Sequence, residues 1–406
     1  MSEDSDHHAF WADEYADQVI ARDPDEPVVI KGGVSPSGVP HIGHVNEIMR
    51  GYYVAAILRE RGYTVRQVFT ADDRDPLRTV PRMLADAEGT LVPLGEVPDP
   101  SVVGRNLGRP YTEIPDPFDC HDSYGEHFTA LLADGAESIG IPVEFVSTTE
   151  LYERGAFEAP TRQFLANREE ARRRLAEYQD SVGPDYVPFR PICASCGLVT
   201  EGVTNVDLAE GTVTYECQDI EAGDQTIEGC GHRGTATLRE GKLPWRFEWP
   251  AQWQALDVDF EPFGKDHAEG SWDSGVEFTR HLLDREPPVP LVYEWFTLDG
   301  AALSSSSGHV ATVDDLLERI EVEVLRYFFA LSPRKARDLD LARIDRLVDD
   351  FDRFEAHYFE GGSDDTTTAF ARRAYPFVID PRTFPSDITT AARDAGLLDE
   401  RSLDAL

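Results

Sequence analysis

A histidine–glycine–histidine motif between a strand and a helix is the feature that most constrains how this chain folds. The motif lies within residues 36–44, PSGVPHIGH, and residues 28–33, VVIKGG, predict a short buried strand that ends in a glycine turn. After it, apolar residues recur every three or four positions from 42 to 58, which predicts an amphipathic helix that ends at Gly62. At such a strand–loop–helix junction, free backbone N–H groups and the helix dipole attract anions. We predict that His41 and His44 donate hydrogen bonds to phosphate oxygens and that Gly43 leaves room for a nucleotide. For an isolated motif, two helix-capping histidines would be the alternative.

A second segment of the same kind follows far downstream. Residues 291–296, LVYEWF, predict a strand, and a serine-rich loop follows at residues 303–308, LSSSSG. Thr312 with Asp315 approximates a capping box at the start of the next helix. Backbone N–H groups and hydroxyls of a serine–glycine loop can form a nest for anions.

The intervening sequence alternates between strands and helices. Strands are predicted at residues 63–70 and 142–147 and a helix at 128–138, the alternation of a parallel nucleotide-binding sheet. A highly charged helical stretch at residues 164–178 then leads into a cysteine-containing module between residues 191 and 237. The fold class predicted is therefore α/β, with an insertion in the sheet domain.

The cysteine-containing module predicts a metal site. Cys193 and Cys196 form a CxxC turn that presents two thiolates to one ion, and Cys230 supplies a third ligand. Cys217 and His232 compete for the fourth position. Four protein ligands leave no open coordination position, so we predict a structural zinc. Cys120 beside His121 is predicted to be a packed thiol next to a solvent-facing imidazole, without a role.

The charge balance bears on partners and location. Asp and Glu total 76 against 38 Lys and Arg, a formal charge of −38. Such a surplus repels nucleic acid in dilute buffer, but at molar salt the Debye length falls to roughly 3 Å. The excess is spread along the chain, so we interpret it as a halophilic surface. No apolar run approaches the roughly 20 residues of a membrane span, and the acidic N-terminus has no hydrophobic signal region. Five cysteines, four of them grouped, fit a reducing compartment. We expect a cytoplasmic protein that binds neither a membrane nor DNA.

The two motifs in this order resemble the HIGH and KMSKS signatures of class I aminoacyl-tRNA synthetases. The chain is more closely similar to the class I lysyl-tRNA synthetases, in a form from a salt-loving archaeon. The supporting segments are residues 32–38 (GGVSPSG), 69–73 (FTADD), 114–118 (IPDPF), 242–246 (KLPWR) and 264–267 (GKDH). The resemblance implies a Rossmann-type parallel-sheet catalytic domain with a zinc-binding insertion and C-terminal helices.

The resemblance also implies a division of the chain into six parts. These are an acidic N-terminal extension (1–27), the first half of the catalytic domain (28–148), the insertion with the zinc module (149–240), the second half with the KMSKS-like loop (241–321), a helical region that contacts the tRNA stem (322–360), and a linker with the remnant of a truncated anticodon-binding region (361–406). Residues 361–368, GGSDDTTT, predict a flexible linker.

The site that the resemblance implies has three groups of residues. The catalytic residues are His41, His44 and Ser307. ATP is bound by Pro36, Ser37, Gly38, His41, Gly43, His44, Gly264, Asp266, Ser304, Ser305, Ser306 and Ser307, with Asp266 accepting ribose hydroxyls. Lysine is bound by Gly33, Ser35, Trp245, His267 and Tyr293, which can supply an aromatic wall and an acceptor for an ammonium group. The expected partners are ATP with Mg²⁺, L-lysine and tRNA(Lys).

The serine-rich loop departs from the family pattern. Both lysines of KMSKS are absent, because their positions fall at Ala302 and Ser307. Our hypothesis is that K⁺ occupies the vacated charge positions; Arg334, Lys335 or Arg337 could substitute instead.

Three functions remain compatible with these patterns. The leading interpretation is a lysine–tRNA ligase. The alternative is a truncated synthetase-like paralogue with lost or reduced tRNA charging and a binding or regulatory role. A different nucleotidyltransferase would share the HxGH motif but would not require the zinc insertion.

Overall fold

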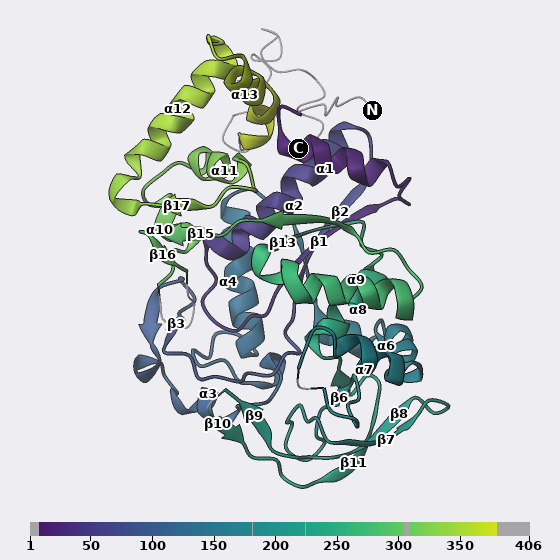
Figure 1. The fold of residues 1–406 in the computed structure, drawn as a ribbon. Helices are drawn as coiled ribbons and strands as arrows, with labels where there is room; N and C mark the ends of the chain where they lie inside the picture. Colours follow the sequence, from purple (N-terminus) through teal and green to yellow (C-terminus); the bar gives the residue numbers. More distant parts are fainter. Residues whose placement is uncertain (1–7, 181, 224, 304–308, 380–406) are drawn as a thin grey trace.

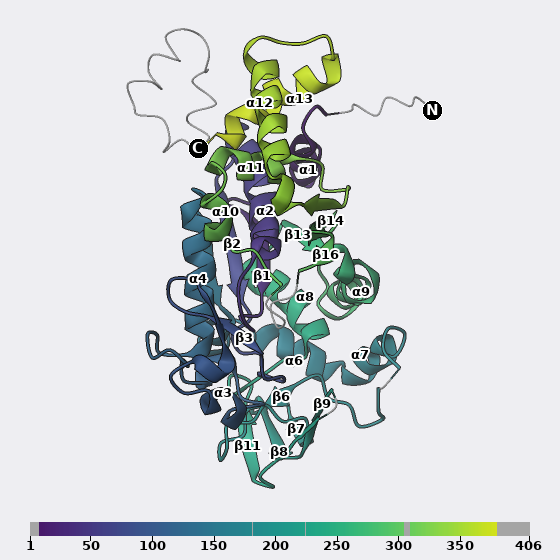
Figure 2. The same ribbon diagram turned by 90° about the vertical axis from the view of Figure 1, so that its left-hand side faces the viewer.

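A parallel sheet forms the centre of the protein. The computed structural model describes residues 8–180, 182–223, 225–303 and 309–379, and Figures 1 and 2 show it from two sides. The five strands lie in the order β14-β13-β1-β2-β5, and every neighbouring pair is parallel. They are β1 (Val28–Val34), β2 (Val65–Ala71), β5 (Glu144–Ser147), β13 (Phe260–Gly264) and β14 (Val289–Tyr293). The chain builds outward from β1 first on one side and then on the other, so the predicted Rossmann-type sheet is confirmed, with its switch point between β1 and β13.

The sheet separates two hydrophobic cores. Along β1, Val28 and Ile30 belong to one core and Val29 to the other, as the two-residue period of a strand requires. The first core is covered by α1 (Trp11–Ile20), α2 (Ile42–Glu60), α4 (Tyr124–Ser138), α11 (Val322–Ala330) and α13 (Asp365–Val378). The second is covered by α5 (Thr148–Glu153), α6 (Glu158–Ala166), α7 (Arg168–Leu175), α8 (Trp245–Leu256) and α9 (Asp273–Leu282). Figure 1 shows α1 and α2 on one side of the strands and α8 and α9 on the other.

Helix α2 lies close against the sheet because of a glycine. A Cβ atom on Gly51 would come 3.0 Å from Nε2 of Gln67 and 3.2 Å from Cγ2 of Ile30, which is closer than ordinary Cβ contacts, so a side chain there would have to displace these neighbours. The helix ends at Glu60 and is followed by Gly62 with a φ of +92°, as the sequence predicted. The close approach places the N-terminus of α2 beside the carboxyl end of β1.

Smaller elements lie between β2 and β5 and pack against the N-terminal part of α4. They are the hairpin β3 (Met83–Ala85) with β4 (Leu91–Pro93), helix α3 (Ser101–Arg105), and 3₁₀ turns at Leu94–Glu96 and Tyr111–Glu113. Tyr111, Tyr124 and Phe128 pack in the small core beneath them. This segment also carries residues 114–127, which return below as a side-chain cluster.

The insertion forms its own small β module at the end of the molecule opposite α12 and α13 (Figures 1 and 2). Its strands are β6 (Arg190–Pro191), β7 (Val203–Asp207), β8 (Thr212–Glu216), β9 (Ile220–Ala222), β10 (Gln225–Ile227), β11 (Arg233–Thr237) and β12 (Gly241–Lys242). Strands β6 and β12 pair where the chain enters and leaves the module. The charged helical stretch predicted over 164–178 contains the end of α6 and the whole of α7, which lie on either side of Asn167.

The C-terminal part packs against the first core. Its remaining elements are β15 (Phe296–Leu298), β16 (Ala301–Ala302), β17 (Arg337–Leu339), α10 (Val313–Leu317) and α12 (Asp345–Phe359). The structure differs from the predicted linker over 361–368, because α13 begins at Asp365. Asp364 caps it by accepting hydrogen bonds from the backbone N–H groups of Thr366 and Thr367. In the described part of the chain, no helix has the length and apolar character needed to cross a bilayer.

Candidate functional site

A cavity of about 680 Å³ opens at the switch point of the sheet. Gly33 and Ser35 at the carboxyl end of β1 line one side of it, and Gly264 at the end of β13 lines the other. Open α/β sheets bind their ligands at this place, outside the carboxyl ends of the strands. The residues predicted from two distant motifs therefore meet in one cavity.

His41 and His44 form the start of α2 and line this cavity with Gly43. The Nδ1 atom of His41 accepts a hydrogen bond from the Gly43 backbone N–H (3.0 Å), and Nδ1 of His44 accepts one from the His41 N–H (3.3 Å). Their rings stack with centroids 4.0 Å apart. Burial lowers the pKa of His41 to about 4 and that of His44 well below its usual value. Both rings are therefore neutral at pH 7, and because Nδ1 accepts, each ring carries its proton on Nε2 as a hydrogen-bond donor.

The remaining predicted phosphate-loop residues lie elsewhere. Ser37 lines a neighbouring cavity, and its carbonyl accepts a hydrogen bond from the Tyr124 hydroxyl (2.9 Å). Pro36 and Gly38 are not among the described residues that line either this cavity or the neighbouring one. Ser304, Ser305, Ser306 and Ser307 lie outside the described residues, and Ala302 and Leu303 just before them line the first cavity.

Asp266 lies at the end of β13, next to an exposed tryptophan that the sequence analysis had assigned only to a strand. Trp295 is 52% exposed, lines the cavity, and donates a hydrogen bond from Nε1 to Oδ1 of Asp266 (3.1 Å). The Lys265 ammonium lies 4.6 Å from the centre of its ring and forms an ion pair with Glu294. A Cβ atom on Gly264 would lie 2.4 Å from Oδ1 of Asp266, so a side chain there would force the Asp266 carboxylate to shift. A flat, fixed ring beside a carboxylate is suited to a nucleoside, whose base can stack and whose ribose can donate.

The five residues predicted to bind lysine all line the cavity. Trp245 stacks on Trp249 at 5.2 Å, and its buried Nε1 has no hydrogen-bond partner among the described residues. Ser35 donates to Oδ2 of Asp75 (2.7 Å), so its hydroxyl hydrogen is already engaged. Tyr293 donates to Oε2 of Glu47 (2.7 Å). His267 lies 6.0 Å from Trp245 between ring centroids and 3.3 Å from the Asp266 carboxylate.

Three carboxylates in this cavity had no role in the sequence analysis, namely Glu47, Asp72 and Asp75. Glu47 lies one turn after His44, and Asp72 follows β2 directly. One signal was present in the sequence, because Lys31 stands within a strand that is otherwise buried and apolar. A charge in that position requires a buried partner.

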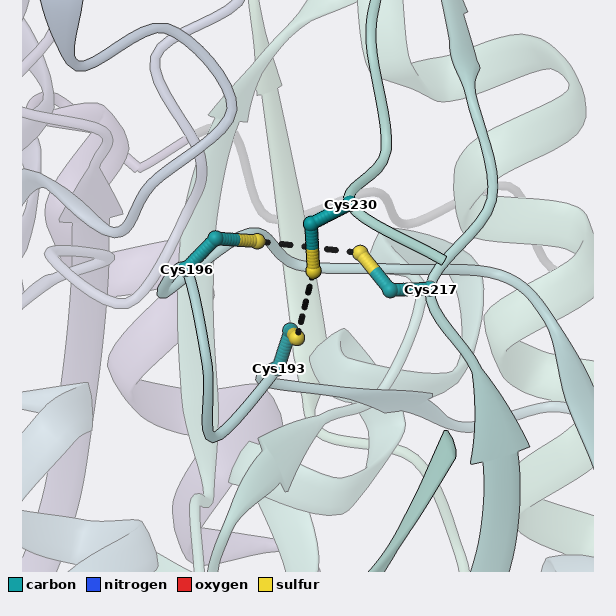
Figure 3. A group of neighbouring side chains, drawn as sticks. All are labelled: Cys193, Cys196, Cys217 and Cys230. Carbon is teal, nitrogen blue, oxygen red and sulfur yellow. Dashed lines mark hydrogen bonds between the residues drawn. The ribbon is translucent and has the colours of Figure 1, made fainter. Parts of the chain in front are cut away.

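The four grouped cysteines converge on one point, as Figure 3 shows. The Sγ atoms of Cys193 and Cys230 are 3.7 Å apart, as are those of Cys196 and Cys217. A tetrahedral zinc with Zn–S bonds of about 2.3 Å requires sulfur–sulfur distances of about 3.8 Å, so the four residues fit zinc. His232, the other candidate for the fourth ligand, is not part of this group.

A second group of possible metal ligands joins Asp116, Cys120, His121 and His127. The Cys120 thiol lies 3.1 Å from Oδ2 of Asp116 and 3.2 Å from Nδ1 of each histidine. The other ring nitrogen of His127, Nε2, is 2.9 Å from the carbonyl oxygen of Ala85. A hydrogen bond of this kind commonly orients the ring of a histidine that binds a metal through its other nitrogen. Mixed sulfur, nitrogen and oxygen donors suit zinc. This group was not predicted from the sequence, because Asp116 and His127 lie four and seven residues from Cys120 and only their folding brings the four side chains together.

A second cavity, of about 710 Å³, adjoins the first, since Asp75 and Trp245 line both. Three guanidinium groups line it, those of Arg78, Arg190 and Arg246. Burial lowers the pKa of Arg78, and the neighbouring Arg190 lowers it further. Arg190 forms an ion pair with Glu201 (2.5 Å), whereas Arg78 and Arg246 form no salt bridge among the described residues, so this cavity can attract an anionic ligand.

Comparison with known proteins identifies the family. The family model described as tRNA synthetases class I (K) matches residues 9–377. A protein of Haloarcula marismortui named lysine–tRNA ligase is 66% identical over 375 residues, which are 92% of this chain and 68% of that protein. Proteins with the same name from Natronomonas pharaonis and Pyrococcus horikoshii are 63% and 34% identical; the matches cover 97% and 87% of this chain and 73% and 66% of those proteins. The chain belongs to the class I tRNA synthetases, in the (K) family.

Proposed function

We propose that this chain is a lysine–tRNA ligase, which activates lysine with ATP and transfers the lysyl group to tRNA(Lys) in the cytoplasm. The observation that carries the proposal is the single cavity at the switch point. There the HIGH histidines lie beside Asp266 of the GKDH segment and beside all five residues expected to bind lysine. Relatives named lysine–tRNA ligase at 60–66% identity support the substrate and disfavour a paralogue without ligase activity.

In the first reaction a carboxylate oxygen of lysine attacks the α-phosphorus of ATP. A C–O–P bond forms, the bond between the α-phosphorus and the bridging oxygen breaks, and pyrophosphate leaves with the electron pair. His41 and His44, neutral with Nε2–H donors, can stabilise the phosphate oxygens without adding charge. Bound Mg²⁺ supplies the positive charge that neutralises the leaving pyrophosphate. The protein contributes mainly by positioning the two substrates.

At the nucleoside end, Asp266 accepts ribose hydroxyls and Trp295 provides a face for the base. At the amino acid end, Trp245 and Tyr293 flank the aliphatic stem, and the unpaired N–H of Trp245 donates to the substrate carboxylate. The two ends share one cavity, which is the arrangement that the reaction requires.

In the second reaction a ribose hydroxyl at the 3′ end of the tRNA attacks the lysyl carbonyl carbon. The acyl–phosphate bond breaks and AMP leaves. We assign the arginine-lined cavity to the tRNA end, because its guanidiniums suit phosphates and its shared wall at Trp245 leads to the first cavity. The cysteine module, which borders this cavity through Arg190, holds a structural zinc in this proposal.

Lysine-dependent exchange of pyrophosphate into ATP tests the first reaction. The assay uses the full chain in molar KCl, with arginine, ornithine and glutamate as controls. Exchange with lysine alone, lowered about 10²-fold in His44→Asn, is the expected result. No exchange with any amino acid from folded protein would overturn adenylation. Exchange followed by failure to charge tRNA(Lys) would leave a lysine-activating paralogue.

A further inference from the structure

Arg78 differs from the other two arginines of the second cavity in how its backbone is held. Arg246 lies on α8, and its guanidinium donates a hydrogen bond to the Ser274 hydroxyl (3.1 Å). Arg190 belongs to β6, just before the CxxC turn that begins at Cys193. Arg78 belongs to no helix or strand and lies in the loop after β2. Its position in the cavity therefore depends on the segments that contact this loop.

The backbone just before Arg78 is bonded to the segment that starts at Gly108. The Leu77 N–H donates to the carbonyl of Arg109 (3.0 Å), and the Leu77 carbonyl accepts from the Gly108 N–H (2.7 Å). Leu77 is itself buried in the small core beside α4. Because these bonds join two backbones, a shift of Gly108 would move the Arg78 backbone with it.

The cysteine module rests on Gly108. A Cβ atom there would come 2.2 Å from Cδ1 of Leu198 and 3.2 Å from Cγ2 of Ile227, so both side chains lie directly against this glycine. The φ of Gly108 is +81°, in the region that favours glycine, and its carbonyl accepts from the Val199 N–H (2.9 Å). Leu198 is only 4% exposed and belongs to the core of the module together with Cys193. The segment that follows the CxxC turn is therefore fixed both to the module and to Gly108.

A second contact joins the module to Arg78 itself. Gln225 on β10 donates a hydrogen bond from Nε2 to the Arg78 carbonyl (2.7 Å). Two separate parts of the module thus hold the backbone at and before this arginine. Among the described residues the Arg78 guanidinium forms no salt bridge, so its charge is available to an anionic ligand in the cavity.

We propose that Leu198 and Gln225 are positioning residues for the transfer of lysine to tRNA, because they place Arg78 in the cavity that receives the tRNA end. The inference rests on the proposed function, which assigns this cavity to the tRNA. It gives the cysteine module a part in the second reaction besides holding a metal. A well-placed guanidinium binds a phosphate through two parallel hydrogen bonds, and a displaced one loses this geometry.

The first reaction should be insensitive to these contacts. Asp75 lines both cavities, and it accepts a hydrogen bond from the Ser35 hydroxyl (2.7 Å) and pairs with Lys242. Loosening the module from Gly108 leaves both of these bonds in place. We therefore expect the KM for tRNA to rise in the positioning variants while pyrophosphate exchange stays unchanged.

Steady-state charging of tRNA(Lys) by the full chain in molar KCl, with pyrophosphate exchange measured in parallel, tests the proposal. Arg78→Ala should raise the KM for tRNA roughly 10-fold or more, because a hydrogen bond to a charged phosphate is lost. Leu198→Ala and Gln225→Ala should each raise it roughly 3- to 10-fold. Leu198→Met, which nearly conserves the volume, should restore the wild-type KM. Leu208→Ala, at a leucine of the same module that is 37% exposed, is the matched control and should charge tRNA like the wild type.

A double-variant cycle separates positioning from a general loss of stability. If Leu198 acts through Arg78, Leu198→Ala should cause no further rise in the KM for tRNA in the Arg78→Ala background. Additive effects of the two substitutions would overturn the inference, and so would a parallel fall in pyrophosphate exchange. Gln225 is exposed, so Gln225→Ala keeps the test decisive even where Leu198→Ala unfolds the module.

Two further outcomes distinguish this inference from the proposed function. A wild type that charges tRNA(Lys), with a KM within twofold of its value in Arg78→Ala or in both positioning variants, would overturn the inference alone. A wild type that exchanges pyrophosphate but charges no tRNA(Lys) would overturn the inference together with the second reaction of the proposed function.

Discussion

Replacing Cys196 by serine should weaken zinc binding at the site proposed for the insertion while leaving the nucleotide site in place. The two sulfur–sulfur distances of 3.7 Å already match the edges of a zinc–thiolate tetrahedron, so each thiolate contributes without rearrangement. Serine at this position keeps the size of the side chain but offers a hydroxyl, which is a much poorer zinc ligand. The module then holds its metal through three thiolates.

The expected loss follows from the number of ligands. Structural zinc sites with four protein ligands contribute apparent free energies of about 10–16 kcal/mol at pH 7. If the four thiolates contribute equally, one of them accounts for about 2.5–4 kcal/mol, or a loss of zinc affinity of roughly 10²- to 10³-fold. The module has its own core, which includes Cys193, Cys217 and Tyr215 and is separate from the two cores on the sheet. The damage should therefore stay local.

Competition with a chromogenic chelator measures the affinity, and fluorescence titration with ATP reports on the sheet. Ser195→Ala, in the same turn and exposed, is the control and should hold zinc like the wild type. Wild-type zinc affinity in Cys196→Ser would show that the four sulfurs do not form the metal site. Loss of ATP binding together with zinc would show that the module is not an independent unit.

Four further outcomes are expected. His44→Asn should lower pyrophosphate exchange by about 10²-fold, because one donor to the phosphates is lost; exchange within threefold of wild type would count against its role. Purified protein should contain two zinc equivalents and Cys120→Ala only one by elemental analysis, and one equivalent in both would exclude the second group as a metal site. Arg326→Met should lower the free energy of unfolding by at least about 4 kcal/mol in denaturant titrations, because four hydrogen bonds of the buried guanidinium are lost. Their acceptors are the carbonyl oxygens of Val378, Ile139 and Phe377 and the hydroxyl of Tyr52. A change below about 1 kcal/mol would contradict this reasoning. Adenylation should require K⁺ specifically, and equal rates in NaCl and KCl at matched ionic strength would refute the hypothesis of a K⁺ counter-ion in the serine-rich loop.

Local patterns in the sequence were sufficient for the framework of the fold. Strand β1, helix α2 and the stop at Gly62 follow from apolar periodicity and a glycine signal, which act over a few residues. The CxxC spacing indicated Cys193 and Cys196, whereas the choice between Cys217 and His232 as the fourth ligand stayed open until the structure grouped Cys217 with the other three cysteines. The prediction of a linker over residues 361–368 was wrong for a related reason. Asp and Thr are typical both of linkers and of helix caps, and only the packing of Ala371, Ala374 and Phe377 on the first core selects the helix.

The charged part of the site could not be predicted in the same way. Lys31 and Glu261 are 230 residues apart, and Asp72 and Gln252 are 180 apart, so no local pattern joins them. Their pairing depends on the sheet order, which brings β1, β2 and β13 together with α8. Family resemblance supplied the aromatic residues of the pocket, whereas the carboxylates became apparent only when each buried charge was matched to a partner.

The distribution of lysine suggests how the site keeps its electrostatics on so acidic a protein. The sequence contains four lysines, and three of them, Lys31, Lys242 and Lys265, lie in or around the first cavity. Two of them, Lys31 and Lys242, are buried in contact with carboxylates. Salt screens charges that are separated by solvent but acts weakly on buried pairs in contact. Molar salt can therefore remove long-range repulsion at the acidic surface while the buried ion pairs around the cavity keep their strength.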